Sequence, residues 1–233
     1  GGNINYTIPG CGYYAPSLSK VNRMTYASDT TNTVFRCNTS YGSGGRAACG
    51  NSSYGWWIGG SYTYCNNYAS TYVERLDYSN DTLITTVGSL TAPSDYSSSV
   101  GNQYYGYNHT TTSPGGTQID RLDYANDSAT ALTRGPLANG NWSKGTMGTQ
   151  SYGYWAGGYW GSTVDRTSYA NDTATSLTRG NLSITQLGGC TGVSNGVEFG
   201  YIVGGATPSP STRMDRIEFA NDTVQATPKG NLS

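Results

Sequence analysis

The chain has 233 residues, a formal net charge of −1 and 12% charged residues, about half the share that soluble proteins usually carry. So weak a charge argues against nucleic-acid binding, which needs a basic patch, and no apolar run approaches the ~18 residues of a membrane span. The 33 Gly, 21 Tyr and 5 Trp indicate a turn-rich β protein in which aromatic side chains supply much of the buried area.

One Arg and one Asp recur along the whole chain. In each copy the Asp follows the Arg by about six residues, an aromatic residue lies between them, and successive copies are about 45 to 52 residues apart. That period is typical of propeller blades or of two-helix repeats. The Arg positions are Arg23, Arg75, Arg121, Arg166 and Arg216, and the Asp positions are Asp29, Asp81, Asp127, Asp172 and Asp222.

The five units span residues 1–39, 40–90, 91–137, 138–182 and 183–233. In chain order, the first predicted element of a unit is an inner strand of small and polar residues. Its four copies are at 45–53, 97–103, 144–150 and 188–196. The second strand is aromatic and ends in a glycine pair, as a strand does where a backbone approaches closely or φ becomes positive. The pairs are Gly59–Gly60, Gly157–Gly158 and Gly204–Gly205, with Ala15–Pro16 in their place in the first unit and Asn108–His109 in the third.

The later elements are clearest in the fourth unit. Residues 163–169 predict the third strand, and Asn-Asp-Thr at 171–173 predicts a turn, because Asn and Asp side chains cap their own backbone two residues on. Residues 174–178 predict the fourth strand, and Arg-Gly-Asn-Leu at 179–182 predicts the turn that closes the unit. The many Gly, Thr, Ser and Asn residues disfavour helices.

Four short antiparallel strands per unit, repeated radially, predict an all-β, five-bladed β-propeller in which residues 1–233 form a single domain. The spacing of the copies leaves room for five whole blades, so we expect a closed ring. The chain begins with Gly rather than Met, and a segment of a longer chain is the open alternative.

The order of these signals resembles the kelch repeat, although the Trp of the kelch outer strand is missing, so kelch sites do not carry over. Residues 117–183 are similar almost throughout to kelch-like arrays of predicted structural proteins of marine tailed phages, cyanophages included, through Asp-Arg-Leu-Asp-Tyr-Ala-Asn-Asp, Arg-Gly and Tyr-Gly-Tyr-Trp-Ala-Gly-Gly. The resemblance implies a protein at the virion surface, with other virion proteins and host cell-surface glycan as partners.

The charged residues argue against catalysis. All acids except Asp95 and Glu198 occupy repeated positions, whereas a glycosidase needs a close pair of carboxylates. His109 is the single His, which excludes a His metal cluster and the two-His copper site of kelch-fold oxidases. We therefore expect a non-enzyme without a cofactor. The five Cys, an odd number, are expected to be mostly small buried residues, with one or two disulfides as the alternative.

The repeated Arg and Asp residues are expected to form charge-assisted pairs of the repeat frame, and recognition is expected in the loops that break the pattern. Exposed Tyr and Trp suit stacking on sugar rings and also anchor protein contacts. The candidate rim residues are Tyr62, Tyr64, Tyr68, His109, Tyr159 and Trp160. The alternative is that the aromatic residues only cover neighbouring blades or pack on another virion subunit.

These features favour a non-enzymatic phage structural or attachment protein of a tail fibre, baseplate or capsid decoration. The alternatives are a secreted, five-bladed glycan-binding lectin of non-viral origin, and a spacer without a ligand. A five-site lectin should repeat its ligand-binding side chains, whereas the loops after the glycine pairs vary here.

Overall fold

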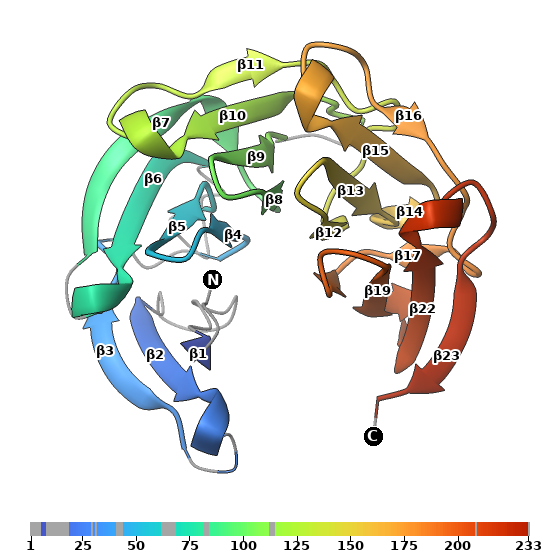
Figure 1. Cartoon of the computed structure of the whole chain (residues 1–233), viewed down its shortest axis with the longest axis horizontal. Coiled ribbons are helices and arrows are strands. Elements are labelled where there is room, and N and C mark those ends of the chain that lie inside the picture. The colour runs from blue at the N-terminus through green and yellow to red at the C-terminus, as the bar shows by residue number, and fades with distance from the viewer. Residues whose placement is uncertain are drawn as a thin grey trace. The chain divides into compact units, whose positions relative to one another are not determined.

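The computed structural model of the chain describes residues 6–7, 19–28, 30, 32–40, 44–61, 69–81, 84–111, 115–207 and 209–232. It is an all-β protein with one three-stranded sheet, four four-stranded antiparallel sheets and two small two-stranded sheets (Figure 1). The expected all-β class is confirmed, and so are four short strands in each of four repeats.

The large sheets follow the repeats of the sequence. The first is ordered β1 (Tyr6–Thr7), β2 (Lys20–Thr25), β3 (Val34–Asn38). The second is ordered β4 (Ala47–Gly50), β5 (Tyr54–Ile58), β6 (Ser70–Asp77), β7 (Ile84–Ser94). The third contains β8 (Ser98–Gly101), β9 (Tyr105–His109), β10 (Ile119–Asp123) and β11 (Leu132–Arg134), also in chain order across the sheet.

The last two large sheets have short extra strands beside them in the sequence. The fourth is ordered β12 (Gly145–Gly148), β13 (Tyr152–Ala156), β15 (Val164–Ser168), β16 (Leu177–Thr178). The fifth is ordered β18 (Cys190–Ser194), β19 (Phe199–Gly204), β22 (Arg213–Glu218), β23 (Thr227–Asn231). The small sheets pair β14 (Tyr159–Gly161) with β17 (Gln186–Leu187), and β20 (Ala206–Thr207) with β21 (Ser209–Pro210).

Each Arg-bearing strand ends in a single 3-10 turn that begins at the repeated aromatic residue. The turns are η1 (Tyr26–Ser28), η2 (Tyr78–Asn80), η3 (Tyr124–Asn126), η4 (Tyr169–Asn171) and η5 (Phe219–Asn221). The turn expected at 171–173 therefore starts two residues earlier. In η2 and η3 an Asp caps the first amides, since Asp77 accepts from Ser79 N at 2.8 Å and Asp123 accepts from Ala125 N at 3.0 Å.

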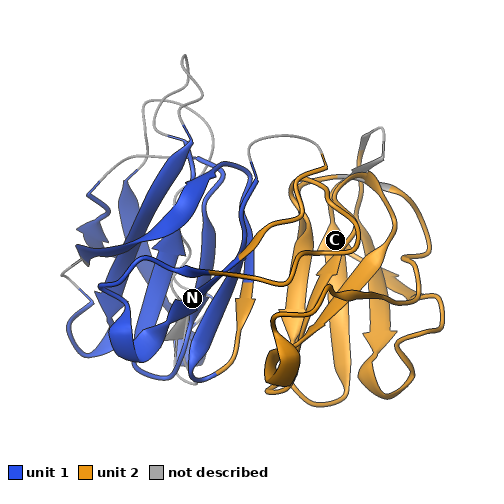
Figure 2. Cartoon of the chain, turned by 90° about the horizontal axis from the view of Figure 1, so that it is seen from above, with its two compact units in different colours: residues 1–99, 103–112, 120–132 blue, residues 100–102, 113–119, 133–233 orange. Residues whose placement is uncertain are grey.

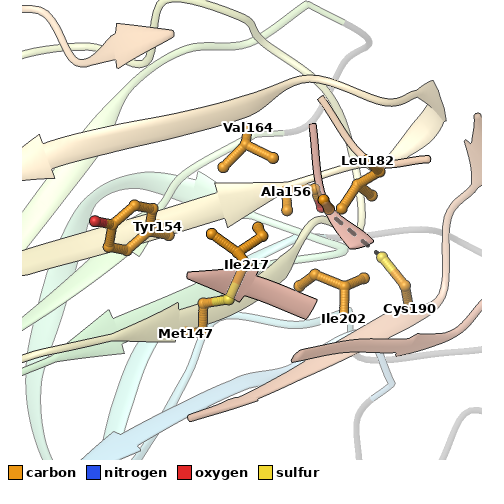
Figure 3. Packing of buried hydrophobic residues seen from close by; sticks show 9 residues of the cluster. Met147, Tyr154, Ala156, Val164, Leu182, Cys190, Ile202 and Ile217 are labelled. Atoms are coloured by element: carbon orange, nitrogen blue, oxygen red, sulfur yellow. Dashed lines mark hydrogen bonds between the residues drawn. The ribbon is translucent and has the colours of Figure 1, made fainter. Parts of the chain in front are cut away.

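The chain divides into two compact units, coloured separately in Figure 2. Unit 1 comprises residues 1–99, 103–112 and 120–132, and unit 2 comprises residues 100–102, 113–119 and 133–233. Within each unit the apolar core lies between consecutive sheets. Figure 3 shows the core of unit 2, where Tyr154 and Met147 of the fourth sheet meet Ile202 and Ile217 of the fifth. In unit 1, Trp56 of the second sheet packs with Leu122 of the third.

The glycine pairs end their strands with positive φ, as the sequence predicts. Gly157 and Gly158 have φ of 67° and 94°, and Gly59–Gly60 and Gly204–Gly205 have the same left-handed backbone. Side chains other than that of Gly are disfavoured there. The backbone therefore reverses direction at the end of β5, β13 and β19.

The Gly of the Tyr-Gly-Tyr motif has a separate cause, which is close packing. A Cβ on Gly153 would lie 2.7 Å from Val100 Cγ1 and 2.9 Å from the Tyr169 hydroxyl. A Cβ on Gly106 would lie 2.6 Å from Cys49 Sγ. In each case a side chain of the inner strand of the preceding repeat occupies the space, so only Gly fits between the two aromatic residues.

The first repeat is placed by its strand register. Tyr6 of β1 lies opposite Thr25, two residues after Arg23, just as Tyr54 lies opposite Asp77, two residues after Arg75. Tyr6 thus occupies the position of the first aromatic residue of the motif. The expected substitution of Ala15–Pro16 for the glycine pair lies outside the described residues.

Candidate functional site

Three of the repeated Arg residues bind the Asp of the next repeat in the chain. The Nη1 atoms of Arg23, Arg75 and Arg166 lie 2.8–2.9 Å from carboxylate oxygens of the next repeat's Asp. The acceptors are Asp81, Asp127 and Asp222 respectively. Asp29 lies outside the described residues. The pairs thus join consecutive sheets within a unit rather than closing a turn on its own strand.

Repeated Asp carboxylates also lie close to other donors of the preceding repeat. Asp222 also accepts from the Tyr154 hydroxyl at 2.9 Å and lies 3.5 Å from Arg179 Nε. Asp172 is 3.4 Å from Arg134 Nε. Where the second repeat has Gly88 instead of this Arg, Trp56 Nε1 donates to Asp127 at 2.8 Å. These buried carboxylates are thereby satisfied by groups of the preceding repeat.

Aromatic rings complete the contact. Arg166 lies over the ring of Tyr152, 4.4 Å from its centroid, and Arg121 and Arg216 lie likewise over Tyr105 and Phe199 of their own repeats. Trp56 stacks on Tyr124 of the next repeat, with centroids 4.0 Å apart and planes 3° apart. Arg, aromatic ring and Asp therefore repeat as one structural set.

The acid directly before each of four repeated Arg residues is also engaged. These acids are Glu74, Asp120, Asp165 and Asp215, with exposed fractions of 0–1%. Each accepts a backbone N–H from the segment that precedes its own sheet, namely that of Ser40, Thr91, Asn139 and Ser183. Burial with these donors leaves none of the four in a position to meet a solvent-borne substrate.

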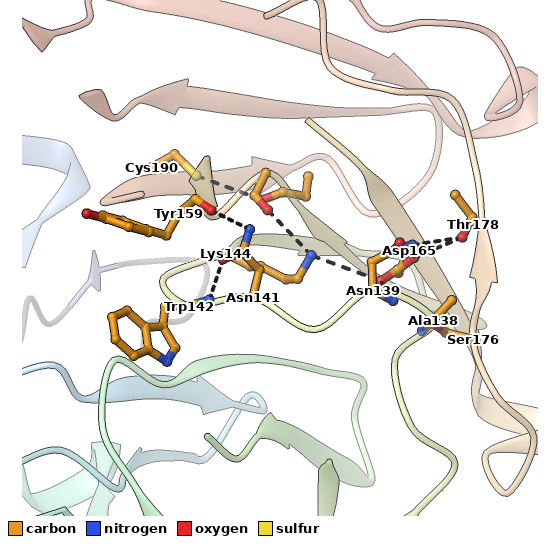
Figure 4. Close-up of polar contacts among 12 residues, drawn as sticks. Ala138, Asn139, Asn141, Trp142, Lys144, Tyr159, Asp165, Ser176, Thr178 and Cys190 are labelled. Carbon is orange, nitrogen blue, oxygen red and sulfur yellow. Dashed lines mark hydrogen bonds and ion pairs between the residues drawn. The ribbon is translucent and has the colours of Figure 1, made fainter. Parts of the chain in front are cut away.

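Two of these acids also face a buried cation at the start of the inner strand. Arg46 Nη1 lies 2.5 Å from Glu74, and Lys144 Nζ lies 4.0 Å from Asp165. Lys144 also donates to the Gly157 carbonyl at 3.4 Å, within the polar network of Figure 4. Burial lowers the pKa of Lys144, and the nearby Asp165 partly opposes that shift.

His109 is not at the predicted recognition rim. It is the last residue of β9 and is fully buried. The burial pattern of β9 matches that of β5 and β13, so His109 corresponds to Ile58 and Ala156 rather than to a glycine. The prediction aligned the glycine pair two residues too early, because Thr110 and Thr111 hold the true equivalent positions and carry no Gly signal.

The other rim residues divide into two groups. Tyr62, Tyr64 and Tyr68 lie outside the described residues. Tyr159 and Trp160 are exposed, to 49% and 62%. The half-buried Trp142, which the sequence reasoning missed, stands 5.9 Å from Tyr159 between ring centroids. Tyr159 and Trp160 are 6.0 Å apart and nearly perpendicular, at 80°. We call Trp142, Tyr159 and Trp160 the aromatic cluster.

A tight turn carries the two exposed rings. Gly161 N donates to Gly158 O at 3.1 Å, so Tyr159 and Trp160 are its central residues. Trp160 has φ of 60°, in a position that usually takes Gly or Asn. A left-handed residue with a Cβ costs about 1–2 kcal/mol. The turn places the Trp160 indole at its tip despite this cost, and such strained residues cluster at functional sites.

Asn141 fixes the turn against the start of β12. Its Nδ2 donates to the Tyr159 carbonyl at 2.8 Å, and its Oδ1 accepts from Trp142 N at 2.9 Å. Tyr159 N in turn donates to the Trp142 carbonyl at 3.1 Å. Figure 4 shows Tyr159 and Trp142 at one end of this network and Asp165 at the other. These hydrogen bonds hold the turn of Tyr159 against the segment of Trp142.

The segments around the aromatic cluster carry no charged side chain. Segments 141–143, 157–161 and 186–189 contain no Asp, Glu, Lys or Arg, and the adjacent Lys144 is buried. Asp95, one of the two acids outside the repeat, is buried, and desolvation raises its pKa. Among the described residues, no three His, Cys, Asp or Glu side chains converge as a metal site would require. The described cysteines Cys37, Cys49 and Cys190 are buried free thiols.

No described helix is long and apolar enough to cross a membrane. No protein-family model matches the chain, and no curated protein matches it.

Proposed function

We propose that the chain is a non-enzymatic module of a virion surface, as part of a tail fibre, baseplate or capsid decoration, and that its aromatic cluster contacts host glycan or a neighbouring virion protein. The observation that carries the proposal is that the repeated charged residues and the exposed aromatic residues have different surroundings. The charged side chains recur and bind one another between repeats, whereas the exposed Tyr159–Trp160 turn is uncharged and non-repeated.

The location on a virion is supported by the similarity of residues 117–183 to kelch-like arrays of phage structural proteins. A non-enzymatic role is supported by the burial of Glu74, Asp120, Asp165 and Asp215 with hydrogen-bond donors. A five-site lectin is less well supported, because Ala206–Thr207 follow the glycine pair in the fifth repeat where the fourth has Tyr159–Trp160.

We further propose that the five repeats are the blades of one closed, kelch-like β-propeller. The fifth sheet supports this, because its outward face carries the residues that other repeats bury against a following sheet. Val193 is 56% exposed, whereas its equivalents Cys49 and Met147 are 7% and 3% exposed. In the described residues Arg216 has its cation–π contact with Phe199 and no ion pair. A further sheet would cover this face.

The functional proposal is tested on particles and on purified protein. Antibody against the chain should label the intact tailed phage that encodes it, seen by electron microscopy. Purified protein should bind either host envelope polysaccharide or an isolated virion protein. If the antibody labels no particle and the purified protein is retained on glycan from an unrelated source, the secreted lectin would be favoured instead.

A further inference from the structure

We infer that the Tyr159–Trp160 turn is a binding site for a neutral hexopyranose unit of a polysaccharide, with the indole of Trp160 as the stacking platform. The inference rests on the proposed surface role of the aromatic cluster and adds the chemistry of its ligand. It starts from the exposure of the two rings, 49% for Tyr159 and 62% for Trp160.

Geometry gives the site its shape. The two rings stand at 80° with centroids 6.0 Å apart, which forms a corner rather than a flat patch. The apolar C–H face of a pyranose ring can lie on one aromatic face while its edge meets the other ring. The Tyr159 hydroxyl and the indole N–H remain as the polar groups that such rings keep for hydrogen bonds.

Charge selects the class of ligand. The segments around the turn, 141–143, 157–161 and 186–189, contain no charged residue, and Lys144 beside them has a fully buried side chain. An acidic polysaccharide or an anionic membrane would require exposed Lys or Arg. A neutral sugar requires none, and aromatic faces with a few polar edges suit it.

The site is pre-organised at a cost to folding. Trp160 holds φ of 60°, and the turn is fixed by the bonds of Gly161 N to Gly158 O and of Asn141 Nδ2 to Tyr159 O. Because the backbone is already ordered, binding loses little further entropy. A Trp that served only in packing would be buried, and it would not need a backbone with positive φ.

The test is titration of the purified chain with hexasaccharides of neutral glucan, mannan and galactan, and with a uronic-acid hexasaccharide as the charged arm. Binding is followed by calorimetry and by the indole N–H resonance of Trp160. We expect one neutral oligosaccharide to bind and to shift that resonance. Trp160→Ala should weaken its binding about tenfold or more, equivalent to ~1.4 kcal/mol, and Tyr159→Ala should also weaken it.

Two further variants separate binding from folding. Trp160→Asn keeps a residue that tolerates positive φ, so it should lose binding while its melting temperature stays equal or rises. Tyr104→Ala removes an equally exposed aromatic residue elsewhere, 64% exposed, and should leave binding unchanged.

Several results would overturn the inference: no binding of any neutral oligosaccharide, preference for the uronic-acid hexasaccharide, or unchanged affinity in Trp160→Ala. If the wild-type chain binds host envelope or a virion protein and Trp160→Ala binds it equally well, this sugar site is wrong and the contact lies elsewhere on the chain, whereas the proposed location on a virion stands. If a neutral sugar binds through Trp160 but no phage particle carries the chain, the site stands and the virion role fails.

Discussion

At the scale of the residue, the Asp222 carboxylate joins the fourth sheet to the fifth through charged and polar contacts. It accepts from Arg166 at 2.8 Å and from Tyr154 at 2.9 Å, and it is 7% exposed. Asp222→Ala would leave a buried hydroxyl without this acceptor and a guanidinium group without its partner. We expect a loss of about 2–4 kcal/mol in unfolding free energy, measured by urea denaturation.

The control for this change is Glu198→Gln, which removes an exposed carboxylate outside the repeat. Its effect should stay within about 0.5 kcal/mol. Equal losses in the two variants would mean that the Asp222 contacts do not hold the sheets together.

Lys144 gives a pH dependence whose sign follows from its burial. The folded chain lowers the pKa of Lys144 below its ordinary value of 10.5, so the unfolded chain binds this proton more tightly. This group therefore makes the folded state more stable as pH rises from the folded pKa toward 10.5. Lys144→Met should abolish that gain, and Asp165 keeps its bonds from Asn139 and Thr178.

The comparison should be made as a difference between wild type and Lys144→Met, because the difference cancels the contribution of the ionisable groups that the two chains share. Chemical denaturation at pH 7, 8, 9 and 10 should show the wild type gaining on the variant as pH rises. A constant difference across this range would contradict a lowered pKa for Lys144.

At the scale of the element, the sequence repeat is enough to place the strands. It gives the wrong register in the third repeat, which lacks the glycine pair. The inner and aromatic strands were predicted because small residues and Tyr-Gly-Tyr recur at them. His109 was misplaced because Thr110 and Thr111 stand where other repeats have Gly, and only the burial pattern of β9 restores the register. Trp142 was missed because its contact with Tyr159 joins two separate segments of the unit.

The pairing of Arg with Asp shows the same limit of sequence reasoning. The six-residue spacing leaves open whether the pair pins a turn of its own repeat or joins the adjacent blade, and in the structure Arg166 binds Asp222 in the next repeat. Regular spacing along the chain cannot distinguish these cases, because every repeat offers the same two groups. The three-dimensional stacking of consecutive sheets decides between them.

The Gly of the aromatic strand can be tested directly. Gly153→Ala would bring a Cβ to 2.7 Å from Val100 Cγ1 and 2.9 Å from the Tyr169 hydroxyl. Val is stiff and cannot turn away, so we expect a loss of about 1–3 kcal/mol in thermal or urea unfolding. Ser151→Ala, at an exposed position two residues away, should change stability by less than about 0.5 kcal/mol. A neutral Gly153→Ala would show that close packing does not explain the motif.

At the scale of the whole molecule, two equivalent glycines test the proposed closed ring. Gly180 follows Arg179 and donates its N–H to the Asp222 carbonyl at 2.8 Å, and a Cβ there would collide with the Val224 carbonyl of the next repeat. Gly230 follows Lys229 in the same position of the fifth repeat, where a Cβ would meet only Met214 Cε, at 3.6 Å.

If a further sheet covers the fifth as the fifth covers the fourth, Gly230→Ala should cost about as much unfolding free energy as Gly180→Ala, ~1–3 kcal/mol by overpacking. Arg216→Ala should then destabilise the chain as Arg166→Ala does, because it would remove an ion pair with an Asp of the covering sheet as well as the contact with the Phe199 ring. Urea denaturation of the four variants measures both comparisons. A costly Gly180→Ala beside a neutral Gly230→Ala would mean that the face of the fifth sheet stays open in solution, and the closed five-bladed ring would have to be abandoned.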